Sequence, residues 1–104
     1  MTKFIQVLTT TDKKNNVTKI TNALLKKRLA ACIHTIPINS GYWWKKKIVK
    51  GKEYLLIIKT KKSLYNKVEK EIIANHDYEI PEIIAVPILN GNKAYLNWLN
   101  SETL

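Results

Sequence analysis

The chain has 104 residues and a formal net charge of +10, from 18 Lys and Arg against 8 Asp and Glu, and it contains one cysteine. This length predicts a single domain, residues 1–104, that can bury enough apolar surface to fold without a disulfide or a structural metal. With Cys32 alone, the sequence excludes an intrachain disulfide, a CxxC redox pair and a four-cysteine zinc site, and it favours a reducing compartment.

The composition also bears on membrane and nucleic-acid partners. The apolar runs are too short for a signal peptide or for the roughly 20 residues of a membrane span, so we expect a cytoplasmic protein with no membrane partner. The positive charge invites a nucleic-acid interpretation, because clustered Lys and Arg bind phosphates with release of counterions. The densest cluster, residues 42–52, combines lysines with aromatics but has no recognisable binding motif, so we expect that nucleic acid is not the partner.

The first half of the chain begins with a strand and a helix. Residues 4–10 are rich in β-branched and apolar side chains, which predicts a strand. Asp12 is the candidate N-cap of an amphipathic helix whose apolar residues recur at helical spacing until about Arg28. Residues 29–36 are almost continuously apolar as far as Pro37, which indicates a second strand.

A hairpin and a second helix are expected next. A third extended segment begins at residues 41–44, and a turn at residues 50–52 leads into an apolar strand over residues 53–60. Ser63 is the candidate cap of the second helix, which we expect to end near Asn75.

The chain closes with a strand and a short helix. Residues 83–86 form the predicted last strand, which Pro87 stops, and Asn92 is the candidate cap of a helix over residues 92–100. The order β-α-β-β-α-β with an added helix predicts an α+β sandwich in which both longer helices cover one face of an antiparallel sheet. The apolar runs 55–58 and 83–86 imply that the other face is apolar too, and another copy of the chain is the simplest cover for it.

Most of the candidate chemistry lies between the second helix and the last strand. This segment carries an imidazole and three carboxylates: His76, Asp77, Glu79 and Glu82. Divalent transition metals accept such ligands near neutral pH, so a metal site is one interpretation. The alternative is an ordinary connector, whose polar groups satisfy a helix end before Pro81.

Three other features have two interpretations each. Cys32 and His34 are two residues apart on a predicted strand, so they could share a metal or form a nucleophile–base pair, although a free cysteine is more commonly a buried, inert side chain. Lys59 could face an acidic loop, although exposure is the default. The aromatic residues could line a pocket, but packing or subunit contact is the commoner role: Tyr42, Trp43, Trp44, Tyr95 and Trp98. Since no motif of a nucleotide-binding site, metalloprotease or serine hydrolase occurs, we expect no catalytic residues and no enzyme.

Five motifs occur in order along the chain: residues 28–32 followed by Pro37, residues 42–44, residues 55–60, residues 76–83, and Gly91 and Asn92 with Tyr95, Leu96 and Trp98. In these motifs the chain resembles the CutA family, small trimeric proteins named for divalent-cation tolerance. The resemblance implies a ferredoxin-like fold, a homotrimer whose sheets pack edge to edge, and an architecture similar to that of the PII signalling proteins. The fold alone settles no activity.

The chain also departs from this family. Some members are credited with binding copper through one cysteine and two adjacent histidines. The cysteine corresponds here to Thr9, and the two histidines correspond to Asn75 and His76. A hydroxyl is a poor ligand for soft copper, so one ligand is lost. Lysines at residues 45–47 and at Lys50 replace residues that are often acidic or glycine in the family, which makes the hairpin basic.

The resemblance leads to two hypotheses. The first is a trimeric protein linked to divalent-metal tolerance of the copper class, with no obligatory cofactor and weak copper or zinc binding through His76, assisted by Asp77, Glu79 or Glu82. The second is a PII-like binding or scaffolding trimer that holds a small anion or a partner segment in clefts between subunits. The residues expected to line such a cleft are Trp44, Lys59, Tyr78, Glu79, Glu82 and Trp98. A third option is that trimer stability itself is the selected property.

Overall fold

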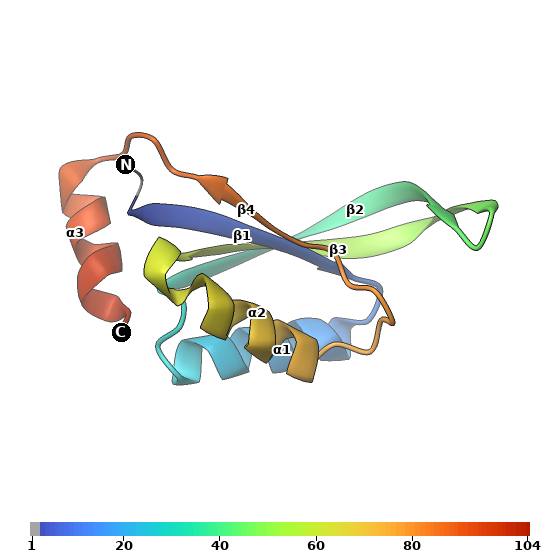
Figure 1. Ribbon diagram of the computed structural model, residues 1–104, viewed down its shortest axis with the longest axis horizontal. Coiled ribbons are helices and arrows are strands. Elements are labelled where there is room, and N and C mark those ends of the chain that lie inside the picture. The colour runs from blue at the N-terminus through green and yellow to red at the C-terminus, as the bar shows by residue number, and fades with distance from the viewer. Residues whose placement is uncertain (1–2) are drawn as a thin grey trace.

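The computed structural model describes residues 3–104, and Figure 1 shows how their elements are arranged. In chain order these are β1 (Phe4–Thr11), α1 (Lys14–Lys26), β2 (Cys32–Trp44), β3 (Lys47–Lys61), a 3₁₀ turn (Lys62–Leu64), α2 (Tyr65–Ala74), β4 (Ile83–Pro87) and α3 (Lys93–Glu102). The strands form one antiparallel sheet in the order β2-β3-β1-β4. The predicted α+β, ferredoxin-like architecture with an added C-terminal helix is confirmed.

The core lies between the sheet and the two longer helices, which cover the same face (Figure 1). Alternate residues of the central strands point to this face and are fully buried, as are residues at helical spacing on the helices: Val7, Leu56, Ile58, Ile20, Leu24, Val68 and Ile72. Each such side chain contributes about 1.5–3 kcal/mol relative to exposure. The predicted amphipathic faces therefore meet as expected.

The opposite face of the sheet carries apolar side chains that α1 and α2 do not cover. Alternation along the paired strands places the remaining residues there, among them Leu8, Ile36, Leu55, Ile57, Ile84 and Val86. Ile36, Ile84 and Val86 are 42%, 50% and 41% exposed. Exposed apolar residues gathered on one face indicate a surface for association.

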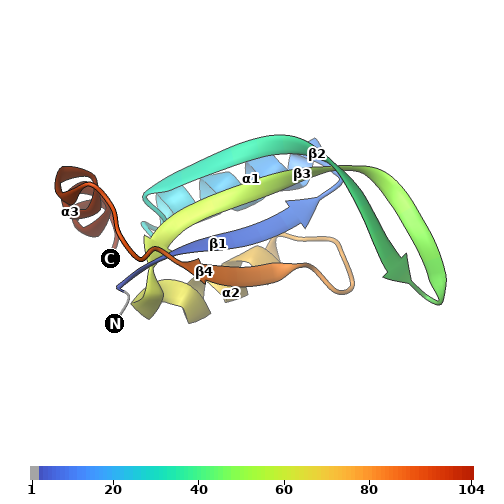
Figure 2. The same cartoon turned by 90° about the horizontal axis from the view of Figure 1, so that it is seen from above.

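The hairpin turn differs from the prediction. It lies at Lys45 and Lys46, not at residues 50–52, and Gly51 pairs with Ser40 within the ladder. Both turn lysines have positive φ, 48° and 66°, as a two-residue loop requires when its twist must match that of the strands. Figure 2 shows the resulting long hairpin projecting from the body of the molecule.

The second strand also ends later than expected, because β2 continues through Pro37 to Trp44 instead of stopping at residue 36. Pro37 has no N–H to donate, and a proline is tolerated in a strand at the edge of a sheet, where β2 lies.

One of the three predicted helix caps is confirmed. Asn92 Oδ1 accepts a hydrogen bond from Tyr95 N at 3.0 Å. The prediction for Asp12 is wrong, because Lys13 is the N-cap of α1 and its N–H donates to the side chain of Thr11 instead. The prediction for Ser63 is also wrong, because that residue lies inside the 3₁₀ turn that precedes α2.

Candidate functional site

His76 follows α2, and its side chain is completely buried. Its Nε2 lies 2.7 Å from the carbonyl oxygen of Thr10, and its Nδ1 lies 3.1 Å from the backbone nitrogen of Tyr78. A carbonyl only accepts and a backbone N–H only donates, so Nε2–H donates to Thr10 and Nδ1 accepts from Tyr78. In this conformation neither nitrogen of His76 has a free lone pair.

Tyr78 packs against His76, with ring centroids 4.6 Å apart, and its hydroxyl donates to Glu53 Oε2 at 2.7 Å. Glu53 is buried, so this hydroxyl provides the polar partner that a buried carboxylate requires. Burial raises the pKa of Tyr78 well above its ordinary value, and the neighbouring Glu53 raises it further. Tyr78 therefore remains a neutral donor that links residues 76–82 to β3.

Asp77 links the same segment to the beginning of α1. It forms an ion pair with the Lys13 ammonium and accepts a hydrogen bond from the Asn16 side chain. The Lys13 ammonium holds the pKa of Asp77 below its ordinary value, and Asp77 in turn raises the pKa of Lys13. The nearest carboxylate oxygen of Asp77 is 3.9 Å from His76 Nδ1.

The other predicted ligands do not gather around His76. Glu79 and Glu82 are exposed, and within residues 3–104 there is no group of three or more His, Cys, Asp or Glu side chains placed to hold a metal. Thr9 is fully buried, and its hydroxyl has no hydrogen-bond partner in the described chain. An ion could reach His76 Nδ1 only by displacing the Tyr78 amide.

The six predicted cleft residues are not brought together within one chain. Trp44 ends β2 beside Lys45, whose ammonium is 5.8 Å from the Trp44 ring centroid, and Trp98 lies on α3 beside Tyr95. The hairpin and α3 stand at opposite ends of a molecule 44 Å long (Figure 1). Residues from these two ends could share a cleft only between different copies of the chain.

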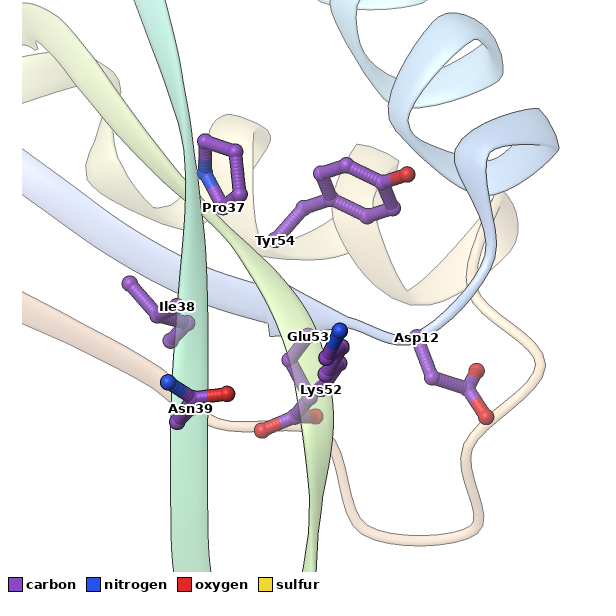
Figure 3. Close-up of a pocket in the computed structure, with 7 residues that line it drawn as sticks. All are labelled: Asp12, Pro37, Ile38, Asn39, Lys52, Glu53 and Tyr54. Carbon is purple, nitrogen blue, oxygen red and sulfur yellow. The ribbon is translucent and has the colours of Figure 1, made fainter.

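A hollow of about 350 Å³ lies where the long hairpin leaves the sheet, at the carboxyl end of β1 (Figure 3). Its lining residues are Asp12, Pro37, Ile38, Asn39, Lys52, Glu53 and Tyr54. Sequence reasoning did not identify this group. The sequence does contain one indication that Glu53 has a special role, since it is the only acidic residue between Asp12 and Glu69.

Cys32 and His34 do meet at the beginning of β2. Cys32 Sγ is 3.6 Å from His34 Nε2, and the Lys59 ammonium is 3.4 Å from the same nitrogen. Lys59 also lies 5.4 Å from the ring centroid of Tyr95. Lys59 thus faces a histidine and an aromatic ring, and the acidic segment at residues 76–82 is not its partner.

No helix in the described part of the chain is both long enough and apolar enough to cross a bilayer.

Comparison with known proteins gives a consistent result. The family model of the CutA1 divalent ion tolerance protein matches residues 5–102. "Protein CutA 1, chloroplastic" of Oryza sativa is 41% identical over 100 residues, which cover 95% of this chain but only 56% of that protein. The divalent-cation tolerance protein CutA of Thermus thermophilus is 39% identical over 98 residues, covering 93% of this chain and 95% of that protein.

A solved structure agrees with these sequence matches. The crystal structure of CutA1 from Oryza sativa has a TM-score of 0.94 and 39% identity, covering 99% of this chain and 95% of that one. Because the match covers 99% of this chain, it spans the sheet, α3 and the long hairpin described above. The chain therefore belongs to the CutA1 divalent ion tolerance protein family.

Proposed function

We propose that this protein acts as a non-catalytic homotrimer in tolerance to divalent cations of the copper class. The observation that carries the proposal is the uncovered apolar face of the sheet, on a chain whose relatives are named for cation tolerance and not for catalysis. Burying that face against other copies removes apolar side chains from water, which is the dominant driving force for association. The choice of a trimer rests on the resemblance to the family. A single cysteine without a disulfide, Cys32, suits a cytoplasmic location.

A matched pair of substitutions tests the assembly. Ile84 and Leu25 are 50% and 42% exposed in the protomer, but only Ile84 lies on the uncovered sheet face, whereas Leu25 is on α1. We expect Ile84→Glu to convert the trimer to smaller species in sedimentation equilibrium, because a carboxylate would be buried in the contact. Leu25→Glu should sediment like the parent. A parent that sediments as a monomer would refute the trimer.

Metal binding at residues 76–82 is proposed to be weak. An ion bound to His76 Nδ1 would replace the hydrogen bond from Tyr78, and the nearest further ligand, Asp77, is already paired with Lys13. Calorimetric titration with Cu(II) and Zn(II) at matched pH tests this role. His76→Gln should reduce the affinity, and Lys13→Met should increase it by freeing Asp77. Equal affinity in the parent and His76→Gln would remove His76 from the site.

The hollow beside Glu53 favours the second candidate, a PII-like trimer that binds a small molecule. Its volume of about 350 Å³ lies within the range of ligand sites, and its lining includes one basic residue, Lys52, and two acidic residues, Asp12 and Glu53. These charges suit a small ligand that carries both an anionic and a cationic group. A panel of metabolites should then raise the melting temperature of the parent but not of Lys52→Met, with Lys50→Met as the control. A panel without any effect on the parent would eliminate this candidate.

A further inference from the structure

The beginning of β2 places a thiol and an imidazole side by side on the uncovered sheet face. Cys32 is opposite Lys59 and His34 is opposite Ile57 in the ladder with β3, so these side chains share a face. Cys32 is half-buried and His34 is exposed. Both side chains can therefore be reached from the surface of the protomer.

The nitrogen of His34 that faces the thiol is the one that can bind a metal. The Lys59 ammonium, 3.4 Å from Nε2, can only donate, so Nε2 is an acceptor and carries a lone pair. This contrasts with His76, where Nδ1 accepts from a backbone N–H and Nε2 donates to a carbonyl. A mobile lysine side chain is easier to displace from an imidazole than a backbone amide in a packed segment.

The separation of the two donor atoms matches chelation of a single ion. Zinc lies about 2.3 Å from a thiolate sulfur and about 2.0–2.1 Å from an imidazole nitrogen, so donors 3.6 Å apart subtend about 110° at the metal. That value is the tetrahedral angle. An ion could thus be held with little movement of either side chain.

We propose that Cys32 and His34 form a two-ligand site for a thiophilic closed-shell ion, Cu(I) or Zn(II). A thiolate favours both ions and an imidazole is an accepted ligand of both. On binding, the ion takes the sulfur of Cys32 and the lone pair of His34 Nε2, and the thiol proton is released to solvent without any change of oxidation state. The site goes beyond the proposed function, since it shares no residue with the segment 76–82.

The charge of Lys59 affects how strongly this site would bind a cation. Its ammonium lies within 3.4 Å of the ligand nitrogen, so a bound cation must displace it and is repelled by its charge. The ring of Tyr95 offers the displaced ammonium a second contact, because the two are already 5.4 Å apart. Lys59 therefore weakens cation binding, and removing its charge should strengthen it.

Competition titrations on the natively assembled protein test the site. Cu(I) is added anaerobically against a chromophoric Cu(I) chelator, and Zn(II) is titrated in a separate arm. Cys32→Ser and His34→Gln should each weaken binding by at least about tenfold, the smallest effect usual even for partners outside the ligand set. Lys59→Met should bind more tightly than the parent, and His76→Gln should leave Cu(I) binding unchanged, because it removes only the weak site for divalent ions in residues 76–82.

A spectroscopic readout separates loss of a ligand from loss of the fold. A thiolate-to-metal charge-transfer band should appear in the parent and in His34→Gln at saturating ion, and should be absent in Cys32→Ser while its circular dichroism stays native. No binding by the parent, undiminished binding by Cys32→Ser or His34→Gln, or weaker binding by Lys59→Met would each overturn the site. Binding lost only in His76→Gln would favour the segment 76–82 instead, and sedimentation reports on the trimer independently.

Discussion

The two histidines of this chain have opposite surroundings. His76 is completely buried, and both of its ring nitrogens are hydrogen-bonded to backbone groups. His34 is exposed on β2, beside a thiol and an ammonium that a ligand could displace. Residues 76–82 contain the most metal-ligating side chains, yet their imidazole is buried in the fold. Cys32 and His34 are less conspicuous in the sequence, yet the imidazole of His34 is accessible.

The difference follows from the backbone around each residue. His34 lies in a regular strand, where β3 already satisfies the neighbouring N–H and C=O groups. His76 lies in an irregular segment, where buried backbone groups need side chains as partners. The imidazole of His76 bridges the Thr10 carbonyl and the Tyr78 amide, so it replaces backbone pairing that a strand would have supplied. Irregular segments use their polar side chains for structure, and regular strands leave them available.

The largest expected effect is on stability at the two histidines. His76→Ala should lower the free energy of unfolding by about 2–4 kcal/mol, because it leaves a cavity and two buried backbone groups without partners. His34→Ala should lower it by less, because the imidazole of His34 contacts only the side chains of Cys32 and Lys59 and satisfies no buried backbone group. Guanidinium unfolding at one fixed protein concentration measures both. If the two variants lost similar amounts of unfolding free energy, His76 would not have the greater structural role that its buried hydrogen bonds imply.

Tyr78 should show the next largest effect. Tyr78→Phe keeps the ring on His76 but removes the only hydroxyl that donates to Glu53 in the described structure, so we expect a loss of about 1–3 kcal/mol in unfolding free energy. Tyr42→Phe is the matched control, because Tyr42 is 43% exposed, and it should unfold like the parent. If both substitutions were neutral, the hydrogen bond to Glu53 would not hold the segment.

Local patterns in the sequence predicted much of this fold. Helical spacing identified both longer helices, apolar runs identified the strands, and Asn92 was recognisable as a cap because its partner Tyr95 is three residues away. The contact between Cys32 and His34 was foreseeable for the same reason. Which of two histidines would be free was not foreseeable, since Thr10 is 66 residues from His76 in the chain.

The hairpin shows a second limit of local patterns. Gly51 with flanking lysines suggested the turn, yet the turn falls at Lys45 and Lys46, where no glycine marks the left-handed conformation. The pairing of β2 with β3 extends from Cys32 and Lys59 to Trp44 and Lys47, and this long register sets the position of the turn. Tertiary pairing here overrides the local preference for glycine.

The smallest expected effect is a pH dependence at Asp77, which anchors the segment of His76 to α1. Its pKa is lowered from 3.8 in the folded protein, chiefly by the hydrogen bond with Lys13, so its contribution to stability is present above that value and is lost as the pH falls through the lower folded pKa. The difference in melting temperature between the parent and Asp77→Asn should therefore be steady above about pH 5 and shrink in more acidic solution. In a Lys13→Met background the difference should be smaller at every pH. The pair is exposed to solvent, so added salt should reduce the difference as well, which distinguishes this surface anchor from the buried bonds of His76.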